Sequence, residues 1–299
     1  MKVGFIGIGN MGFGMASNVL KKGFETAAFD LKQETLDRFA AIGGKTVKTN
    51  AELGDCDVVY VMTMTGAQAE SALFDANGLC STLKKGAVVI ITASCGGKYM
   101  KEIAAKMPEG IAVLDCPVTG GQTGANNGTL TFMISGAKDV IESIRPVLEA
   151  CASNIYYCGP NPGDGQNAKS CNQLMTGITY IASAEAMVLA AKAGLDPEVV
   201  ANVIGNGIAG SQMFRQVANY EMDRAFTAGG AGMHTMYKDM GLVMDLARDT
   251  ECPLQFGALT TEYFRTGWVK YQKECTWALA KITEELAGTE VVRGMNKAE

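Results

Sequence analysis

The sequence predicts an α/β N-terminal domain with a doubly wound sheet, followed by an all-α C-terminal domain. Up to about residue 159, short apolar runs rich in β-branched residues alternate with amphipathic segments of helix length. After the turn-rich stretch GPNPGDG, residues 159–165, only helical periodicity is found. The chain has 299 residues, of which 47% are hydrophobic, enough for two domains with substantial cores. We therefore expect domains at 1–164 and 165–299.

The expected strands are apolar runs, and the helix-length segments between them indicate a mostly parallel sheet covered on both faces. The strands are expected at residues 2–7, 25–30, 45–48, 57–62, 87–92, 112–118, 130–135 and 154–158. The helices between them are expected at 11–22, 33–42, 67–74, 98–107 and 137–150. The C-terminal helices are expected at 167–193, 197–204, 212–224, 235–248, 254–269 and 276–286, the first being a long interdomain helix. A cleft between the two domains is where we expect a small-molecule site.

Charge and cysteine content narrow the class of protein. The net charge is −5 and no block of like charges occurs, so we expect no nucleic-acid partner and no membrane partner. The nine cysteines are scattered without a C-x-x-C pair, which indicates reduced thiols rather than disulfides or a zinc site, and we expect no metal. The start MKVGFIG does not fit a signal peptide, and no uninterrupted apolar segment approaches membrane-span length. A cytoplasmic location is expected.

The single histidine, His234, restricts the available chemistry. Catalysis by a histidine base must use His234 or be abandoned. We expect His234 at a helix start or at the edge of the cleft.

Five glycines crowd the first strand-to-helix connection, and three of them, Gly7, Gly9 and Gly12, form G-x-G-x-x-G around Asn10 and Met11. The first glycine permits a tight turn, the second lets the backbone approach a pyrophosphate, and the third lets the helix pack closely on the strand. The N–H groups of the helix start then face the phosphates. This pattern predicts a Rossmann-like dinucleotide site at these five residues.

Asp30 strengthens that prediction because it lies eighteen residues beyond Gly12, at the end of the second expected strand. A carboxylate there binds the adenosine ribose hydroxyls and repels a 2′-phosphate, which favours NAD over NADP. Lys32 lies nearby and could soften this preference, so NADP stays the alternative cofactor. The competing interpretation is a glycine-rich turn without a ligand and an aspartate that merely ends a strand.

A polar stripe interrupts the most apolar helix. Within residues 168–194, Lys169, Asn172, Gln173 and Thr176 follow the spacing of a single helical face. A lysine desolvated in a cleft has its pKa pulled from about 10.4 toward neutrality and becomes a general base for a hydroxyl proton. Asn172 and Gln173 would then orient the substrate oxygen. Alternatively, Lys169 extends into water while the amides cap nearby backbone.

Four separated segments carry a resemblance that covers the whole chain. They are GFIGIGNMGFGMASNVLKKG (4–23), DCPVTGGQTGANNGTLTFMISG (115–136), GDGQNAKSCNQ (163–173) and KDMGLVMDLA (238–247). The chain resembles the β-hydroxyacid dehydrogenases, the group of 3-hydroxyisobutyrate dehydrogenase, tartronate semialdehyde reductase, L-threonate dehydrogenase and, more distantly, 6-phosphogluconate dehydrogenase.

The resemblance implies roles for particular residues. It implies that Lys169 is the catalytic lysine and that Thr119, Gly120 and Gly121 grip the substrate carboxylate, although a glycine turn between strands would look the same. It also implies that Ser94 lies near the nicotinamide. Lys238 matches a lysine near substrate and cofactor, the alternative being a solvated helical face.

Departures from the family pattern bear on the substrate. The family usually has asparagine where this chain has Gln173, and glutamine there resembles the tartronate semialdehyde and threonate members. The stretch 173–195 looks most like the threonate branch. Decarboxylating phosphogluconate enzymes have glutamate where this chain has Thr176, so we expect oxidation without decarboxylation. Related imine reductases commonly replace the lysine that this chain keeps.

These observations predict a reversible, NAD-dependent dehydrogenase of a small 3-hydroxy acid, 3-hydroxyisobutyrate-like or threonate-like. Two alternatives stay open: a tartronate semialdehyde reductase, and a catalytically silent nucleotide-binding sensor or scaffold. The tail of the substrate is expected to contact residues around 211–215 and 229–234, with Gln212 and Arg215 as candidates. The apolar long helix predicts a homodimer or homotetramer, as in relatives.

Overall fold

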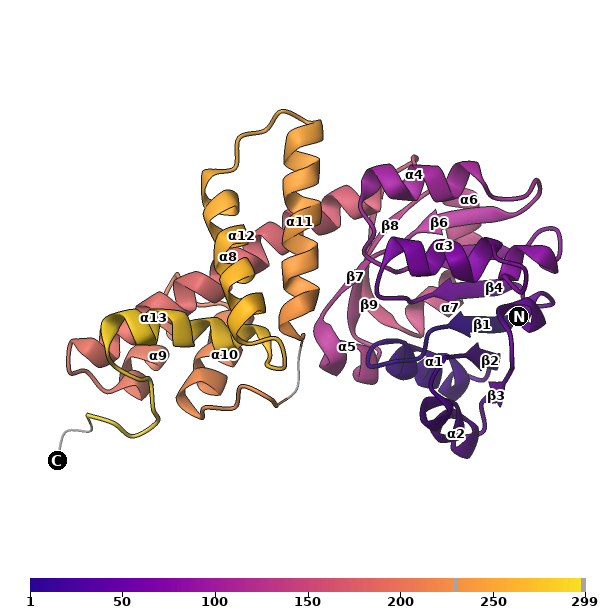
Figure 1. The fold of residues 1–299 in the computed structure, drawn as a ribbon. Helices are drawn as coiled ribbons and strands as arrows, with labels where there is room; N and C mark the ends of the chain where they lie inside the picture. The colour runs from indigo at the N-terminus through magenta and orange to yellow at the C-terminus, as the bar shows by residue number, and fades with distance from the viewer. Residues whose placement is uncertain (229–230, 297–299) are drawn as a thin grey trace. The chain divides into compact units, whose positions relative to one another are not determined.

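The computed structural model describes residues 1–228 and 231–296 (Figure 1). Contacts divide the chain into two compact units, Met1–Lys169 and Ser170–Glu299. The division falls inside helix α8 (Asp164–Lys192), so the start of this helix, up to Lys169, belongs to the first unit.

The first unit is built on one sheet, whose strands run in the order β3-β2-β1-β4-β5-β6-β8-β7, with β9 paired to β8. The strands are β1 (Lys2–Ile6), β2 (Glu25–Phe29), β3 (Lys45–Thr46), β4 (Val58–Val61), β5 (Val88–Ile91), β6 (Ala112–Asp115), β7 (Val118–Thr119), β8 (Leu130–Ser135) and β9 (Ala152–Gly159). Pairing is parallel from β3 through β6 and between β8 and β9, whereas β6 and β7 pair with β8 in the antiparallel sense. The chain order reverses on either side of β1, which is where doubly wound sheets bind ligands.

Helices cover both faces of this sheet. They are α1 (Gly12–Lys21), α2 (Gln33–Ala41), α3 (Gly66–Phe74), α4 (Gly97–Ala105), α5 (Gly121–Asn127), α6 (Lys138–Ser143) and α7 (Arg145–Glu149), with short 3₁₀ turns at Asn50–Leu53 and Leu79–Ser81. Strand β4 shows why two layers form, because successive side chains point to opposite faces. Val58 and Tyr60 join the core beneath α1 and α7, while Val59 and Val61 join the core beneath α3 and α4. This confirms the doubly wound α/β prediction.

Proline explains two differences from the expected elements. The strand expected at 112–118 is split into β6 and β7, with Cys116 and Pro117 between them, because proline has no N–H to donate to a strand partner. The helix expected at 137–150 is interrupted at Ile144, and Pro146 lies in the first turn of the short helix α7. The sequence analysis also missed α5, which lies in a glycine-rich stretch.

Apart from one isolated bridge between Gly232 and Cys275, the regular elements among the described residues of the second unit are helices, which confirms the all-α prediction. After α8 it contains α9 (Pro197–Asn206), α10 (Gln212–Met222), α11 (Met233–Asp249), α12 (Gln255–Lys270), a 3₁₀ turn (Thr276–Leu279) and α13 (Ala280–Ala287). Helices α11 and α12 run alongside each other (Figure 1). Met233, Met240 and Phe264 belong to the buried core of this unit.

Helix α8 corrects one expectation from the sequence. Over 29 residues it is long and apolar enough to cross a membrane by length and composition alone, with a mean hydropathy of 1.5 in its most apolar window and 39% of that window buried. The core helices of soluble proteins also have such compositions. The low burial means that much apolar surface of α8 is left uncovered by the described residues.

Candidate active site

The glycine-rich turn lies between β1 and α1, at the carboxyl edge of the sheet. A Cβ placed on Gly12 would come 2.1 Å from the carbonyl oxygen of Gly7, so only glycine allows this close approach. At Gly9 a Cβ would meet nothing within 4 Å, so open space lies beside this backbone. These are the two properties that a pyrophosphate site requires, and the residues present therefore fit a dinucleotide.

Asp30 follows β2 directly and ties the glycine-rich turn to the neighbouring strand. Its Oδ2 accepts from the Ile8 N–H at 2.8 Å, and its Oδ1 accepts from the Lys32 N–H at 2.9 Å. Each carboxylate oxygen has a further lone pair to accept a ribose hydroxyl. Asp30 thus stands beside the turn that the sequence assigns to the phosphates, as the dinucleotide interpretation expects.

The loop predicted to bind the substrate carboxylate, Thr119–Gly121, lies at the junction of β7 and α5. Thr119 pairs with Thr131 of β8, which holds its backbone at the sheet edge. Gly120 and Gly121 have φ angles of 120° and 62°, a left-handed backbone that favours glycine. Both glycines are exposed.

Lys169 reaches this same loop. Its Nζ donates to the carbonyl oxygen of Val118 at 2.9 Å, although the two residues are 51 positions apart in the chain. Val118 directly precedes Thr119. The amine that the resemblance assigns to catalysis therefore lies one residue from the loop assigned to the substrate carboxylate.

Ser94 follows β5 in a segment held by a buried polar cluster that the sequence analysis missed. Gln166 accepts from the N–H groups of Cys95 and Gly96 at 2.9 and 3.1 Å, and its Nε2 donates to Asp115 at 2.7 Å. Burial raises the pKa of the Asp115 carboxyl to about 6, against the opposing effect of its hydrogen bonds. The available signal was a charged residue inside the apolar run 112–118.

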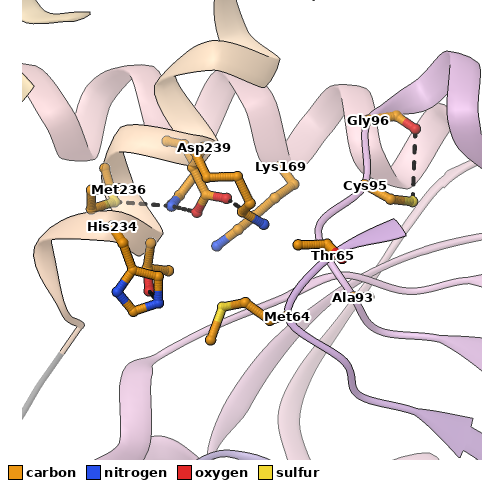
Figure 2. Close-up of polar contacts among 12 residues, drawn as sticks. Met64, Thr65, Ala93, Cys95, Gly96, Lys169, His234, Met236 and Asp239 are labelled. Carbon is orange, nitrogen blue, oxygen red and sulfur yellow. Dashed lines mark hydrogen bonds and ion pairs between the residues drawn. The ribbon is translucent and has the colours of Figure 1, made fainter. Parts of the chain in front are cut away.

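Asn172 and Gln173 lie in the second unit and are joined to each other. Asn172 Nδ2 donates to Gln173 Oε1 at 3.0 Å. Gln173 is only 7% exposed, and its Nε2 donates to Asp239 Oδ2 at 2.5 Å and to Met236 Sδ at 3.2 Å. Figure 2 shows Met236 and Asp239 together on α11 with these bonds dashed. The Gln173 amide is thus engaged by the protein at both its oxygen and its nitrogen.

Lys238 forms an ion pair with the adjacent Asp239, Nζ to Oδ1 at 3.0 Å. Its side chain is a quarter exposed, whereas that of Asp239 is buried. The same aspartate therefore contacts two of the residues that the sequence analysis selected, Gln173 and Lys238, both in the second unit.

Four further residues from the sequence analysis occupy distinct positions in the second unit. His234 is the second residue of α11, exposed, with its ring edge-on to Trp268, which agrees with the expected helix start. Thr176 donates to the Asn172 carbonyl at 2.8 Å. Gln212 begins α10, and Arg215 on the same helix donates to the Gly205 carbonyl. Of the expected segment 229–234, residues 229 and 230 lie outside the described residues.

Comparison with known proteins assigns both halves of the chain. Residues 2–159 match the family described as the NAD binding domain of 6-phosphogluconate dehydrogenase. Residues 163–278 match the family described as NAD-binding of NADP-dependent 3-hydroxyisobutyrate dehydrogenase. Together with the glycine-rich turn, these matches establish NAD or NADP as the cofactor.

Individual relatives match over nearly the whole length. L-threonate dehydrogenase of Cupriavidus necator is 36% identical over 264 residues, covering 88% of this chain and 89% of its own. Mitochondrial 3-hydroxyisobutyrate dehydrogenase of Mus musculus is 33% identical over 278 residues, covering 88% and 81%. Among solved structures, a 3-hydroxyisobutyrate dehydrogenase from Salmonella typhimurium superposes with a TM-score of 0.88 at 32% identity, covering 94% of this chain and 99% of that one.

The two-domain fold and the glycine-rich dinucleotide turn agree with these matches. The chain belongs to the β-hydroxyacid dehydrogenase family, oxidoreductases that act on a hydroxy acid with NAD or NADP.

Proposed function

We propose that this protein exchanges hydride reversibly between NAD and a small 3-hydroxy acid of the threonate type, without decarboxylation. The contact between Lys169 Nζ and the Val118 carbonyl is the observation that carries the proposal. It brings the amine to the residue that directly precedes the Thr119–Gly121 loop. A 3-hydroxy acid carries its hydroxyl and its carboxylate on one short chain, so one molecule can engage both.

In this proposal the uncharged amine of Lys169 accepts the proton of the substrate hydroxyl while the adjacent C–H bond breaks and the carbonyl forms. Bound NAD supplies the hydride acceptor. The Val118 carbonyl accepts one amine hydrogen and so restricts the nitrogen lone pair to the two remaining positions about the Cε–Nζ bond. In the reverse direction the Lys169 ammonium returns the proton to the carbonyl oxygen.

Thr119, Gly120 and Gly121 hold the carboxylate through a hydroxyl and backbone N–H groups. We assign contact with the carbinol to Asn172. We assign Gln173 the role of orienting Asn172 through their hydrogen bond. The Gln173 amide itself is already hydrogen-bonded to Asp239, Met236 and Asn172.

The cofactor preference that we propose is NAD, supported by the Asp30 carboxylate beside the glycine-rich turn. The negative charge of Asp30 repels a 2′-phosphate and so disfavours NADP. We place Ser94 and Lys238 near the nicotinamide end of the cofactor, as the family pattern implies.

A spectrophotometric substrate panel tests the function. Purified protein is mixed with L-threonate, 3-hydroxyisobutyrate, glycerate and 3-hydroxypropionate, with NAD and NADP in parallel, and tartronate semialdehyde is tested with NADH. The proposal predicts the highest kcat/KM for L-threonate with NAD. A higher kcat/KM for tartronate semialdehyde would favour the reductase alternative. Tight NAD binding without turnover of any compound would instead indicate a sensor or scaffold.

Matched lysine variants test the role of Lys169. Lys169→Ala is predicted to lower kcat by roughly 100-fold or more, the contribution of a general base, with NAD affinity nearly unchanged. Lys101→Ala, at an exposed position on α4, serves as the control for removing one lysine charge. Equal turnover in the two variants would refute the assigned role.

We propose that Thr176 leaves the enzyme without a proton donor for catalysed decarboxylation. Its hydroxyl already donates to the Asn172 carbonyl, and a threonine hydroxyl is a far weaker acid than a glutamic acid. Carbon dioxide released in a fixed ratio to NADH from a substrate that turns over would contradict this.

We also propose a cytoplasmic homodimer or homotetramer with no nucleic-acid or membrane partner. Met175 and Leu189 on α8, Val203 on α9 and Phe256 on α12 are large apolar residues left exposed in the single chain, and such surfaces commonly mark subunit contacts. The nine cysteines are all unbridged, which suits a reducing compartment. Light scattering tests the assembly, and a monomer at micromolar concentration would contradict it.

A further inference from the structure

Asp115, the last residue of β6, is a carboxylate only 1% exposed within the first unit. Its Oδ2 accepts from the N–H groups of Gly163 and Gln166, both at 3.0 Å, and from Ser135 Oγ at 3.2 Å. Its Oδ1 accepts from Gln166 Nε2 at 2.7 Å. Four donors converge on this group, which is how a buried carboxylate keeps its charge.

Asp115 and Ser135 cap the N-terminal end of α8. The first N–H groups of a helix have no partner within the helix, and here a strand supplies the acceptors. Asp115 takes the N–H of Gln166, and Ser135 Oγ takes the N–H of Gly165 at 3.2 Å. The first turn of α8 is therefore fixed to the ends of β6 and β8, and Lys169 follows Gln166 by three residues, about one helical turn.

The side chain of Gln166 also connects the first turn of α8 to the segment after β5 by hydrogen bonds. Its Oε1 accepts from the N–H groups of Cys95 and Gly96, and its Nε2 also donates to the Ala93 carbonyl at 3.1 Å. Figure 2 shows Ala93, Cys95 and Gly96 following one another in this segment. One amide thus holds the backbone on both sides of Ser94.

The two segments also touch through their backbones. A Cβ on Gly163 would come 2.6 Å from the Gly97 carbonyl oxygen, and a Cβ on Gly165 would come 2.5 Å from the Met133 carbonyl oxygen. Only glycine fits such contacts. The start of α8 is therefore pressed onto the sheet edge and onto the segment that carries Ser94.

We propose that Asp115 and Gln166 are positioning residues that lock the first turn of α8 and the segment 93–96 into one rigid frame, which presents Lys169 to the loop after Val118. The frame acts through Lys169 and Ser94 and is not expected to touch the substrate. The inference rests on the proposed function only in the role that it gives to Lys169.

The test compares Asp115→Asn with a control that makes the same chemical change elsewhere. The amide keeps one acceptor oxygen and puts an NH2 group in place of the other, so one side of the donor cluster loses its acceptor and the remaining hydrogen bonds no longer go to a charge, while size is kept. Glu221→Gln is the control, since Glu221 is a buried carboxylate of α10 whose two oxygens have no hydrogen-bond partner among the described residues. Ser135→Ala, which removes a single member of the cluster, is a milder variant in case Asp115→Asn fails to fold.

The first readout needs no substrate. Hydrogen exchange followed by mass spectrometry is predicted to show amides of residues 163–169 exchanging about tenfold faster in Asp115→Asn, because their hydrogen bonds no longer go to a charged group. Ser135→Ala should shift the same segment less, and Glu221→Gln should not shift it. Unchanged exchange at 163–169, or an equal acceleration over the whole chain, would overturn the proposal.

The second readout is kinetic, with L-threonate and NAD as the probe. Asp115→Asn is predicted to lower kcat by roughly 100-fold, the effect of a displacement of about 1 Å at a catalytic group, with KM changed far less. A kcat equal to that of the Glu221→Gln control would overturn the positioning role. Should wild-type protein oxidise none of the acids, the proposed function fails, while the exchange result still decides whether the frame exists.

Discussion

Two alanine substitutions in the glycine-rich turn should affect different properties: Gly12→Ala the stability of the fold, and Gly9→Ala the binding of the cofactor. Gly12→Ala places a methyl group 2.1 Å from the Gly7 carbonyl oxygen, inside the protein itself. Gly9→Ala places its methyl group where nothing lies within 4 Å. The first methyl group clashes with the protein, and the second occupies only the space that we assign to the pyrophosphate.

The magnitudes follow from that geometry. A contact of 2.1 Å to a backbone atom forces the turn to move by more than 1 Å to reach van der Waals distance, and overpacking of this kind costs about 1–3 kcal/mol. Gly12→Ala should therefore lower the free energy of unfolding by that amount. Gly9→Ala should fold as the wild type does but weaken NAD binding by a similar energy, roughly fivefold to 150-fold in Kd.

Two measurements separate these outcomes. Thermal unfolding without cofactor reports the stability of each variant, and quenching of protein fluorescence by NADH reports its affinity. The reasoning is refuted if Gly9→Ala binds NADH as tightly as wild type, because the open space beside Gly9 would then not be the cofactor site.

Three other substitutions make separate predictions. Asp30→Asn should lower the preference for NAD over NADP by roughly fivefold, because about 1 kcal/mol of charge repulsion at a partly exposed site is removed, and the ratio of kcat/KM values for the two cofactors measures it. Gln173→Asn should shorten the side chain, leave Asp239 without its 2.5 Å hydrogen bond and lower the unfolding free energy by about 1–3 kcal/mol in urea titrations. Because burial raises the pKa of Asp115 to about 6, above its ordinary value of 3.8, the native state binds the proton more tightly than the unfolded state. The difference in unfolding free energy between wild type and Asp115→Asn should therefore favour wild type most below pH 4. It should fall by roughly 3 kcal/mol as the pH rises to about 6 and stay level at higher pH. A difference that rises with pH would contradict this.

The sequence predicted the strands of the first unit well because their signal is local. Runs such as 57–62 and 87–92 are apolar, β-branched and bounded by polar or glycine residues, and β4 and β5 lie within them. Helix α5 was missed because GGQTGANNG consists of residues that favour turns. Its Gly124 faces the Leu130 side chain, a packing contact that no local pattern reveals.

The site was partly predictable for the same reason. The glycine spacing and Asp30 form a pattern that can be read along the chain, and the structure places Asp30 against the turn. The bond between Gln166 and Asp115 joins residues 51 positions apart, and the bond between Gln173 and Asp239 joins residues 66 positions apart, so only the folded chain brings these groups together. Spacing along α8 identified Gln173 as one of a polar stripe but could not show that Asp239 would occupy its amide.

Chemical rescue of Lys169→Ala tests the central claim most directly. Single-turnover NADH formation is followed with the best acid of the panel while methylamine is added, and Lys101→Ala is measured in parallel. The account predicts that Lys169→Ala forms NADH slowly and that its rate rises with the concentration of uncharged methylamine. The rate of Lys101→Ala should not change when methylamine is added. A Lys169→Ala variant as fast as the control would show that another group takes the hydroxyl proton.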